Sequence, residues 1–456
     1  MNKYLTIIIV IALLTIFSGC AKLLDLQPSQ NISEDIALNS DKNVKSVLIG
    51  AYSLFAQPGI YGGCVLRNAE LLGGNGEIQW VGTYIDPRQL FNKTMISTNS
   101  EAYDHWYNAY QVINSANNVL SALSVVNDAD RDRVAGEALF LRGMMYFDLV
   151  RFFALQYKFG GGNTQMGVPL VLTPTHGINS SSYVSRNSVE EVYAQVITDL
   201  TDAAAKLPAD NNVYASKGAA NALLARVYLQ KGDYVNAGIA ADAVIAYGIA
   251  SDKYKILPDY ASVFNNDNNS EEDIFATQIT PQDRFSAMTE YFSVPEYGGR
   301  DGDIDILQAH LDLYPAGDKR KDLFFIGNGA WRTGKWNNQY GVVNLIRFSE
   351  MYLIRAECNK RIDPTEAAYV GDTPTNDYNV IHTRAGLTAI GTATLDTILY
   401  ERRLELAFEG FKIHDIRRLH ENVVSYSYDD PKLILPIPAR ELDANPGLKN
   451  EQNEGY

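Results

Sequence analysis

The chain has 456 residues, of which 46% are hydrophobic and 20% are charged. This composition supports a sizeable buried core and excludes a chain that is disordered throughout. The formal net charge is −15. An acidic surface repels phosphate backbones, so a nucleic-acid partner is not expected.

The N-terminus, MNKYLTIIIVIALLTIFSGC, has the pattern of an export signal. A charged start precedes an apolar run that ends at Phe17, shorter than the ~20 residues of a membrane-spanning helix. Ser-Gly-Cys then resembles a bacterial lipobox, although leucine is commoner than Phe17 at its position. We therefore expect a signal peptide over 1–19, lipidation of Cys20 and a tether over 20–33. The alternative is an ordinary signal peptide whose cysteine lies just past the cleavage site.

Helical periodicity dominates the rest of the chain, which we predict to be one mainly α domain over 34–456. The sequence Ser188-Val189-Glu190-Glu191 fits a capping box at the start of a helix that ends at Leu207-Pro208. The other predicted helices cover 105–123, 133–153, 219–246 (as a pair), 344–358, 376–387 and 401–419. The closing LILPIPARELDANPGLKNEQNEGY is predicted to form a short strand, a turn and a polar tail.

The helix pair at 219–246, AANALLARVYLQKGDYVNAGIAADAVIA, indicates the architecture. Ala225 and Tyr228 lie one turn apart, Gly232-Asp233 makes the turn, and Tyr234 opens the second helix. Small residues where helices touch and aromatic residues between them are typical of tetratricopeptide repeats. Several helix pairs of similar length favour a stacked α/α superhelix with a few short strands.

Two stretches interrupt this pattern, at about 61–98 and 250–340. Both are rich in glycine and polar residues, and we predict loops with short strands there. Long loops in a compact protein are usually functional. We therefore expect functional residues in these two stretches.

Motifs of catalysis and cofactor binding are missing from the sequence. None of its six histidines forms HExxH or another close metal pair, and there is no G-x-S-x-G or phosphate loop. Asp301, Asp303 and Asp305 alternate as calcium ligands do, but the glycine and glutamate of an EF-hand loop do not follow. Cys64 and Cys358 would be able to pair in an exported protein, which the sequence does not decide.

The segment ERRLELAFEGFKIHDIRRL (401–419) combines high charge with two apolar helical faces. A helix through this segment places Arg402 within an apolar stripe and Glu409 beside it. An unpaired buried charge is very costly, so each of these side chains needs an oppositely charged partner. We interpret both residues as ties to neighbouring helices and not as catalytic groups.

Several motifs in order along the chain resemble the SusD/RagB family of Bacteroidetes lipoproteins. They are ALFLRGMMYFDLVRFF, MGVPLVLTP, SVEEVYAQVITDL, ANALLARVYLQKGDY, IRFSEMYLIRAE, HTRAGL, RRLELAFEGFKIHDIRRL and the closing LILPIPARELDANPGLKNEQNEGY. Two departures are Lys412-Ile413, where the family usually has arginine and an aromatic residue, and NEGY for the usual NPGY.

The resemblance implies a tetratricopeptide-like scaffold whose inserted loops form the binding face. It also implies a surface-exposed protein, lipid-anchored in the outer membrane, that covers a SusC-like TonB-dependent transporter. Members of the family bind oligosaccharides, or peptides in some relatives, and perform no chemistry. No cofactor and no metal are implied.

Aromatic rings that stack on a sugar, together with polar groups for its hydroxyls, are the side chains expected in such a face. The candidates are Asn75, Glu77, Trp80 and Tyr84 in the first stretch, and Tyr297, Arg300, Trp331 and Trp336 in the second. Each aromatic residue has core packing as its alternative. The protein as a whole has three alternatives: a peptide binder, a surface glycoside hydrolase with paired carboxylates, and a purely structural helical adaptor.

Overall fold

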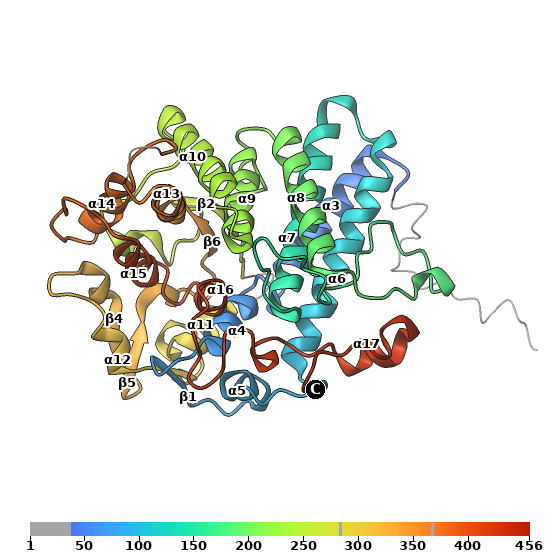
Figure 1. Ribbon diagram of the computed structural model, residues 1–456. Coiled ribbons are helices and arrows are strands. Elements are labelled where there is room, and N and C mark those ends of the chain that lie inside the picture. Colours follow the sequence, from blue (N-terminus) through green and yellow to red (C-terminus); the bar gives the residue numbers. More distant parts are fainter. Residues whose placement is uncertain (1–37, 282–284, 366–368) are drawn as a thin grey trace, which may run out of the picture.

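The computed structural model describes residues 38–281, 285–365 and 369–456 (Figure 1). The predicted signal peptide, Cys20 and the tether lie outside these residues. Within the described ranges, no helix has the length and apolar character needed to cross a membrane.

Long helices form an arc across the upper part of Figure 1. Successive members pack against each other, from α6 and α7 through α8, α9 and α10 to α13. This stack confirms the predicted mainly α, tetratricopeptide-like scaffold. Its helices are α3 (Asp41–Phe55), α6 (Ser100–Ser121), α7 (Asp128–Phe153), α8 (Val189–Lys206), α9 (Lys217–Lys231), α10 (Tyr234–Ser251), α13 (Phe348–Ile362), α14 (Pro374–Arg384) and α15 (Leu395–Glu405).

Local sequence signals fix where these helices begin and end. Ser188 and Glu191 form the predicted capping box at the start of α8. Gly232 ends α9 in the left-handed region at φ 80°, and the Asp233 side chain accepts a hydrogen bond from Asn236 N at 3.2 Å to start α10. The turn between the two helices is therefore the one that the sequence predicts.

The first interrupting stretch is more helical than its glycine content suggests. It contains α4 (Cys64–Leu72) and α5 (Ile85–Asn92), and only β1 (Ile78–Trp80) is a strand. The prediction of loop with short strands was wrong here. Every residue of α4 is buried, including Arg67, Asn68 and Glu70, so tertiary packing on all sides stabilises this short helix.

The second stretch is largely irregular, as predicted, and carries most of the strands. Antiparallel pairing gives a four-stranded sheet in the order β1-β3-β5-β4 and a separate pair of β2 with β6. Ile78 of β1 is opposite Ile306 of β3, so the sheet joins the two interrupting stretches. The elements are β2 (Asp273–Thr277), α11 (Ala287–Phe292), β3 (Ile304–Ile306), α12 (Gln308–Leu311), β4 (Phe324–Gly327), β5 (Ala330–Thr333) and β6 (Val343–Arg347).

The C-terminal part departs from the prediction in three places. The helix predicted over 344–358 begins as strand β6. The segment 401–419 is two helices, because after α15 the chain turns through Phe408 at φ 63° and Gly410 at φ 83° before α16 (Lys412–Arg418). The predicted closing strand is absent from the described residues, where a loop leads to the short helix α17 (Ala439–Ala444).

Short 3-10 turns complete the secondary structure. They are η2 (Leu123–Val125), η3 (Ser180–Ser182), η4 (Tyr260–Val263), η5 (Pro295–Tyr297), η6 (Lys319–Leu323), η7 (Gly334–Trp336), η8 (Pro431–Leu433) and η9 (Pro446–Leu448). One large hydrophobic core extends from Val44 in α3 to Leu448 in η9 and includes the sheet residues Ile78 and Ile306. The two interrupting stretches are thus attached to the same core as the helices.

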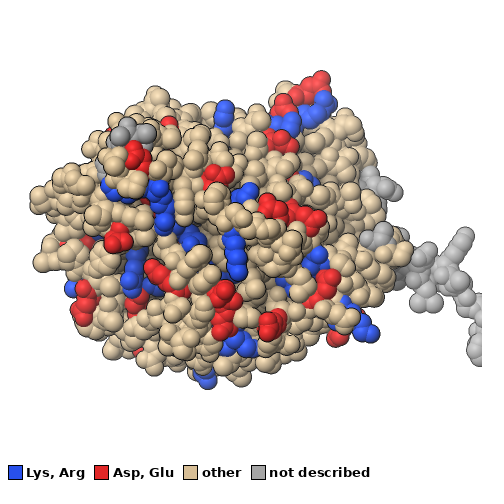
Figure 2. Space-filling model, viewed as in Figure 1, with Lys and Arg blue, Asp and Glu red and all other residues tan. Residues whose placement is uncertain are grey.

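Charged side chains are unevenly distributed over the face drawn in Figure 2. Lys and Arg gather toward its centre, where Figure 1 places α13, α15 and α16, and Asp and Glu lie beside them. The chain as a whole carries a net charge of −15, so this concentration of positive charge is a local departure from the overall charge.

Candidate ligand-binding surface

The loop after β1 and the loop before β3 are held together by main-chain hydrogen bonds. Val81 N and Gly82 N both donate to Asp303 O, at 2.9 and 3.2 Å. A Cβ atom at Gly82 would lie 2.7 Å from Trp80 Cζ2 and even closer to the Asp303 carboxylate. Only glycine allows the two loops to approach this closely.

This approach brings together Tyr84 and Arg300, which come from different interrupting stretches. The Arg300 Cζ atom lies 3.7 Å from the centroid of the Tyr84 ring, a cation–π contact. Arg300 Nη2 donates to Thr83 Oγ1 at 3.2 Å, and the Arg300 Nε atom lies 3.7 Å from Asp303 Oδ2. Tyr84 is 46% exposed. We call Thr83, Tyr84, Arg300 and Asp303 the Tyr84–Arg300 surface.

Two polar atoms of this surface are buried and have no hydrogen-bond partner among the described residues. They are Arg300 Nη1, a donor, and Asp303 Oδ2, an acceptor. Burial raises the pKa of Asp303, and the nearby Arg300 partly opposes that shift. A hydroxyl group both donates and accepts, so it is able to satisfy a neighbouring donor and acceptor.

Tyr291 supports the surface from below. Its ring centroid lies 6.0 Å from that of Trp80 and 6.3 Å from that of Tyr84. The guanidinium of Arg67 lies 4.1 Å from the Tyr291 ring centroid and pairs with Glu101. Packed aromatic rings and an ion pair hold Tyr84 in place without using its exposed face.

The other four predicted aromatic residues do not all lie around Tyr84; they are Trp80, Tyr297, Trp331 and Trp336. Trp80 and Trp336 are 6% and 3% exposed, and Trp336 Nε1 donates to Phe408 O at 3.0 Å. Their burial favours the core-packing alternative, since neither ring presents a free face for stacking. Trp331, half-buried, shares a sheet face with its register partner Ile306.

Tyr297 lies on the other side of the same sheet. Its ring meets Phe325 edge-on, with centroids 5.8 Å apart. Phe325 precedes Ile326, the register partner of Trp331, and neighbouring residues of a strand point to opposite faces. Tyr297 and Trp331 are therefore separated by the sheet.

Asn75 and Glu77 lie in a different environment. Asn75 Oδ1 accepts from Val424 N at 2.8 Å, which fastens the loop after α16. Glu77 accepts from Lys412 Nζ at 2.6 Å and His310 Nδ1 at 2.8 Å, and also pairs with Arg403. Burial alone would raise the pKa of Glu77, but His310 and the two cations outweigh it and hold that pKa well below its usual range.

Two of the three alternating aspartates are paired with arginine side chains. Asp303 faces Arg300, and Asp305 Oδ1 lies 2.8 Å from Arg332 Nη1. Across the part of the chain that the structure describes, no group of three or more side chains is arranged to hold a metal ion. Cys64 and Cys358 are both buried free thiols, so they do not form a disulfide in this structure.

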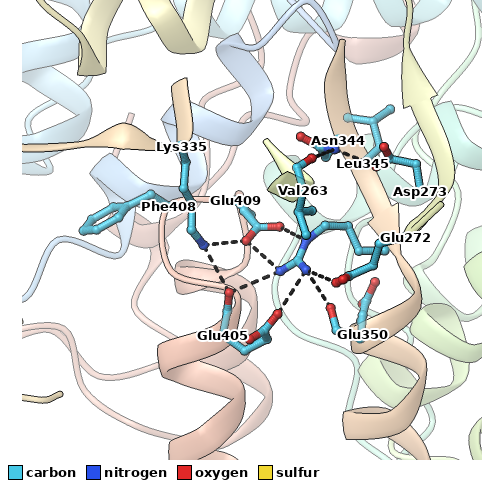
Figure 3. Close-up of polar contacts among 12 residues, drawn as sticks. Val263, Glu272, Asp273, Lys335, Asn344, Leu345, Glu350, Glu405, Phe408 and Glu409 are labelled. Atoms are coloured by element: carbon cyan, nitrogen blue, oxygen red, sulfur yellow. Dashed lines mark hydrogen bonds and ion pairs between the residues drawn. The ribbon is translucent and has the colours of Figure 1, made fainter. Parts of the chain in front are cut away.

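The charged segment 401–419 is tied to the interior, as its sequence predicts. Glu409 accepts from Lys335 Nζ at 2.6 Å and from Arg347 Nε at 2.7 Å (Figure 3). Arg347 also pairs with Glu272 and Glu405. Arg402 Nε donates to Asp415 at 2.9 Å. Arg402 is therefore tied to a neighbouring helix, α16, as predicted, whereas Glu409 is tied to η7 and to the end of β6 and not to an α-helix.

Comparison with known proteins shows the family of this chain. A family profile described as "Starch-binding associating with outer membrane" (SusD-like) matches residues 22–229, and the profile of the SusD family matches residues 325–432. Together they match more than half of the chain. The protein belongs to the SusD/RagB family.

Individual relatives are distant in sequence but extend over the whole chain. A SusD-like protein P2 of Formosa agariphila is 24% identical over 100% of both chains. A crystal structure of a SusD superfamily protein from Bacteroides thetaiotaomicron has a TM-score of 0.78 at 25% identity, covering 90% of this chain and 98% of the other. A SusD-like carbohydrate binding protein from Bacteroides vulgatus has a TM-score of 0.77 at 23% identity, covering 91% and 98%. SusD-like proteins are generally carbohydrate-binding proteins of the outer membrane.

Proposed function

We propose that this SusD-like protein is a non-catalytic, lipid-anchored, surface-exposed protein that binds oligosaccharides. It would deliver them to a SusC-like TonB-dependent transporter in the outer membrane. Family membership supports the general class, and the export signal with Cys20 supports the anchor. The Tyr84–Arg300 surface is the observation in this chain that supports a sugar as the ligand.

The surface offers the contacts that a sugar ring requires. Arg300 covers one face of the Tyr84 ring, and the part of the ring that stays exposed offers apolar contact to the C–H groups of the sugar. Arg300 Nη1 and Asp303 Oδ2 are the unsatisfied donor and acceptor beside the Tyr84 ring. Val81 and Ile85, close to Tyr84 in the sequence, are exposed apolar side chains as well.

Isothermal titration with neutral oligosaccharides and with peptides of similar size tests the proposal. Binding to an oligosaccharide should weaken at least tenfold in Tyr84→Ala and in Arg300→Gln. Tyr183→Ala is the matched control, because Tyr183 is 44% exposed in the loop before α8. Binding of peptides but not sugars would support the peptide-binding alternative, and equal effects of Tyr84→Ala and Tyr183→Ala would contradict the site.

The non-catalytic role has a separate test. Incubation of the protein with the bound oligosaccharide should release no reducing sugar over the time of the titration. Release that disappears on substitution of a pair of acids would show a glycoside hydrolase instead.

A further inference from the structure

A pocket of about 270 Å³ opens between α15 and α16, away from Tyr84. It is close to the lower end of the ~300–1,000 Å³ range of ligand pockets, which suits a single ring. Both apolar and charged side chains line it. The apolar ones include Leu399 and Leu406, and the charged ones are four acids and the four bases Arg402, Arg403, Lys412 and Arg418.

On one side of the pocket two cations share a single carboxylate oxygen. Arg403 and Lys412 both donate to Glu77 Oε1, while Glu77 Oε2 contacts His310 Nδ1. Burial lowers the pKa of His310, so this imidazole adds no positive charge at neutral pH. Two positive charges therefore face one negative charge at this wall.

Glu70 supplies little further negative charge at this wall. Its carboxylate accepts hydrogen bonds from Gly410 N at 2.9 Å and Phe411 N at 3.2 Å. Burial raises the pKa of Glu70 to about 7, and Lys412 only partly opposes the shift. At pH 7 about half of the molecules therefore carry Glu70 in its neutral form.

A second group of charges lines the pocket. Asp415 accepts from Arg402 Nε at 2.9 Å and from Arg418 Nε at 2.6 Å. Arg418 has a further partner in Glu357, which Arg361 shares. Arg402 and Arg418 therefore have two carboxylates between them, those of Asp415 and Glu357.

Arg402 is the least satisfied of these cations. It is 2% exposed, and neither its Nη1 nor its Nη2 atom has a hydrogen-bond partner among the described residues. Its next acid is Glu350, whose Oε1 atom lies 3.7 Å from Arg402 Nη2. Glu350 already accepts two hydrogen bonds from Arg226, at 2.9 and 2.6 Å.

The pocket thus combines apolar side chains with cations whose partners are shared or missing. Arg403 and Lys412 share one carboxylate oxygen, and Arg402 has two buried nitrogen atoms without a hydrogen-bond partner among the described residues. The acids Asp396 and Glu421 line the pocket too, but both are exposed, as Arg403 is, and solvent and salt weaken the effect of exposed charges. The unpartnered donors of Arg402 and the two cations that share one carboxylate favour an anionic ligand over a neutral one.

We propose that this pocket binds one hexuronate ring, with its carboxylate toward Arg403 and Lys412. A carboxylate is the group that guanidinium and ammonium donors bind most strongly. The C–H groups of the ring lie against Leu399 and Leu406. Phe411 does not stack on the sugar, because the Arg226 and Arg402 guanidinium carbons lie 4.8 and 5.2 Å from its ring centroid.

Titration of the purified protein with D-glucuronate, D-glucose and acetate tests this inference. Glucuronate should bind at least tenfold more tightly than glucose, which lacks the charge, and than acetate, which lacks the ring. Equal binding of glucuronate and glucose would overturn the inference. Equal binding of glucuronate and acetate would reduce the pocket to a general anion site and would overturn it as well.

Two variants locate the binding. Leu399→Trp fills the pocket while keeping every charge, and it should abolish glucuronate binding. Arg403→Gln should weaken it at least tenfold. Arg131→Gln is the matched control, since the Arg131 and Arg403 side chains are 42% and 41% exposed and each pairs with an acid. Binding that survives both pocket variants, with folding verified by circular dichroism, would contradict the assignment.

The inference does not depend on the proposed function, and the two fail separately. Tyr84→Ala should leave glucuronate binding unchanged. If Tyr84→Ala abolishes glucuronate binding, the acid binds at the Tyr84–Arg300 surface and the pocket assignment is wrong, while the proposed function stands. If glucuronate binds in the pocket but no oligosaccharide binds at Tyr84, the pocket stands and the proposed function fails.

Discussion

Glu409→Gln tests whether the charged C-terminal segment is a structural element. The substitution removes the charge that compensates two buried cations, because Glu409 contacts Lys335 Nζ at 2.6 Å and Arg347 at 2.7 and 2.9 Å. Breaking a buried ion pair from one side costs ~3–5 kcal/mol. Gln keeps the shape and one acceptor, so the lower end of that range is expected.

The expected change in melting temperature follows from the size of the protein. The entropy of unfolding is ~2.1 cal/mol/K per residue, so roughly 400 ordered residues give about 0.8 kcal/mol/K. A loss of ~3 kcal/mol therefore lowers the Tm by about 4 °C in differential scanning calorimetry. Oligosaccharide binding at 20 °C, far below the transition, should be unchanged.

Glu271→Gln is the matched control, because Glu271 forms an exposed ion pair with Lys255 at 2.8 Å. An exposed pair contributes ~0–1 kcal/mol, so its Tm should fall by about 1 °C or less. An unchanged Tm in Glu409→Gln together with lost ligand binding would refute the structural interpretation and make Glu409 part of a binding site.

Three further predictions concern single positions. Glu70 has a pKa of 4.5 when unfolded and about 7 when folded, so the folded state binds the extra proton between these values and stability falls as pH rises. Glu70→Gln should remove roughly 3 kcal/mol of this loss of stability, measured as the free energy of unfolding in urea at pH 5 and at pH 8. An equal loss between the two pH values in both proteins would contradict this. Gly82→Ala should weaken oligosaccharide binding at least tenfold because Cβ would collide with Trp80, whereas Gly50→Ala, with open space at a helical position, should stabilise the protein by ~1 kcal/mol and leave binding intact. Burial raises the pKa of Cys64 to about 12, so neither Cys64 nor the fully buried Cys358 should react with a thiol reagent until the protein is denatured. Fast reaction of the native protein would show that a thiol is exposed.

Periodicity and capping signals predict the helical body well. The turn at Gly232-Asp233 and the capping box at Ser188 depend on residues close together in sequence, so they can be recognised without tertiary information. Helix α4 depends instead on burial of all its residues against distant elements. The glycines that flank this helix are typical of loops, so the sequence predicted a loop here; they are Gly62, Gly63, Gly73 and Gly74.

The candidate site was only partly predictable for a similar reason. Residue type indicates that Tyr84 and Arg300 suit a sugar, but their contact depends on the approach of two loops more than 200 positions apart. Asp303 alternates with Asp301 and Asp305, which suggests a metal, whereas its main-chain oxygen joins the loops. The burial of Trp80 and Trp336 follows from sheet and turn packing, for which residue type gives no signal.

The segment 401–419 shows how one backbone turn changes the meaning of a charge pattern. A continuous helix would place Glu409 beside Arg402, but the turn at Phe408 and Gly410 directs the two side chains to different places. Glu405 and Glu409 join the buried network around Arg347, whereas Arg403 and Lys412 line the pocket beside α15. Structural and binding roles are therefore divided between the two sides of the segment. Substitution of Glu409 should change stability and not glucuronate affinity, and substitution of Arg403 should do the reverse.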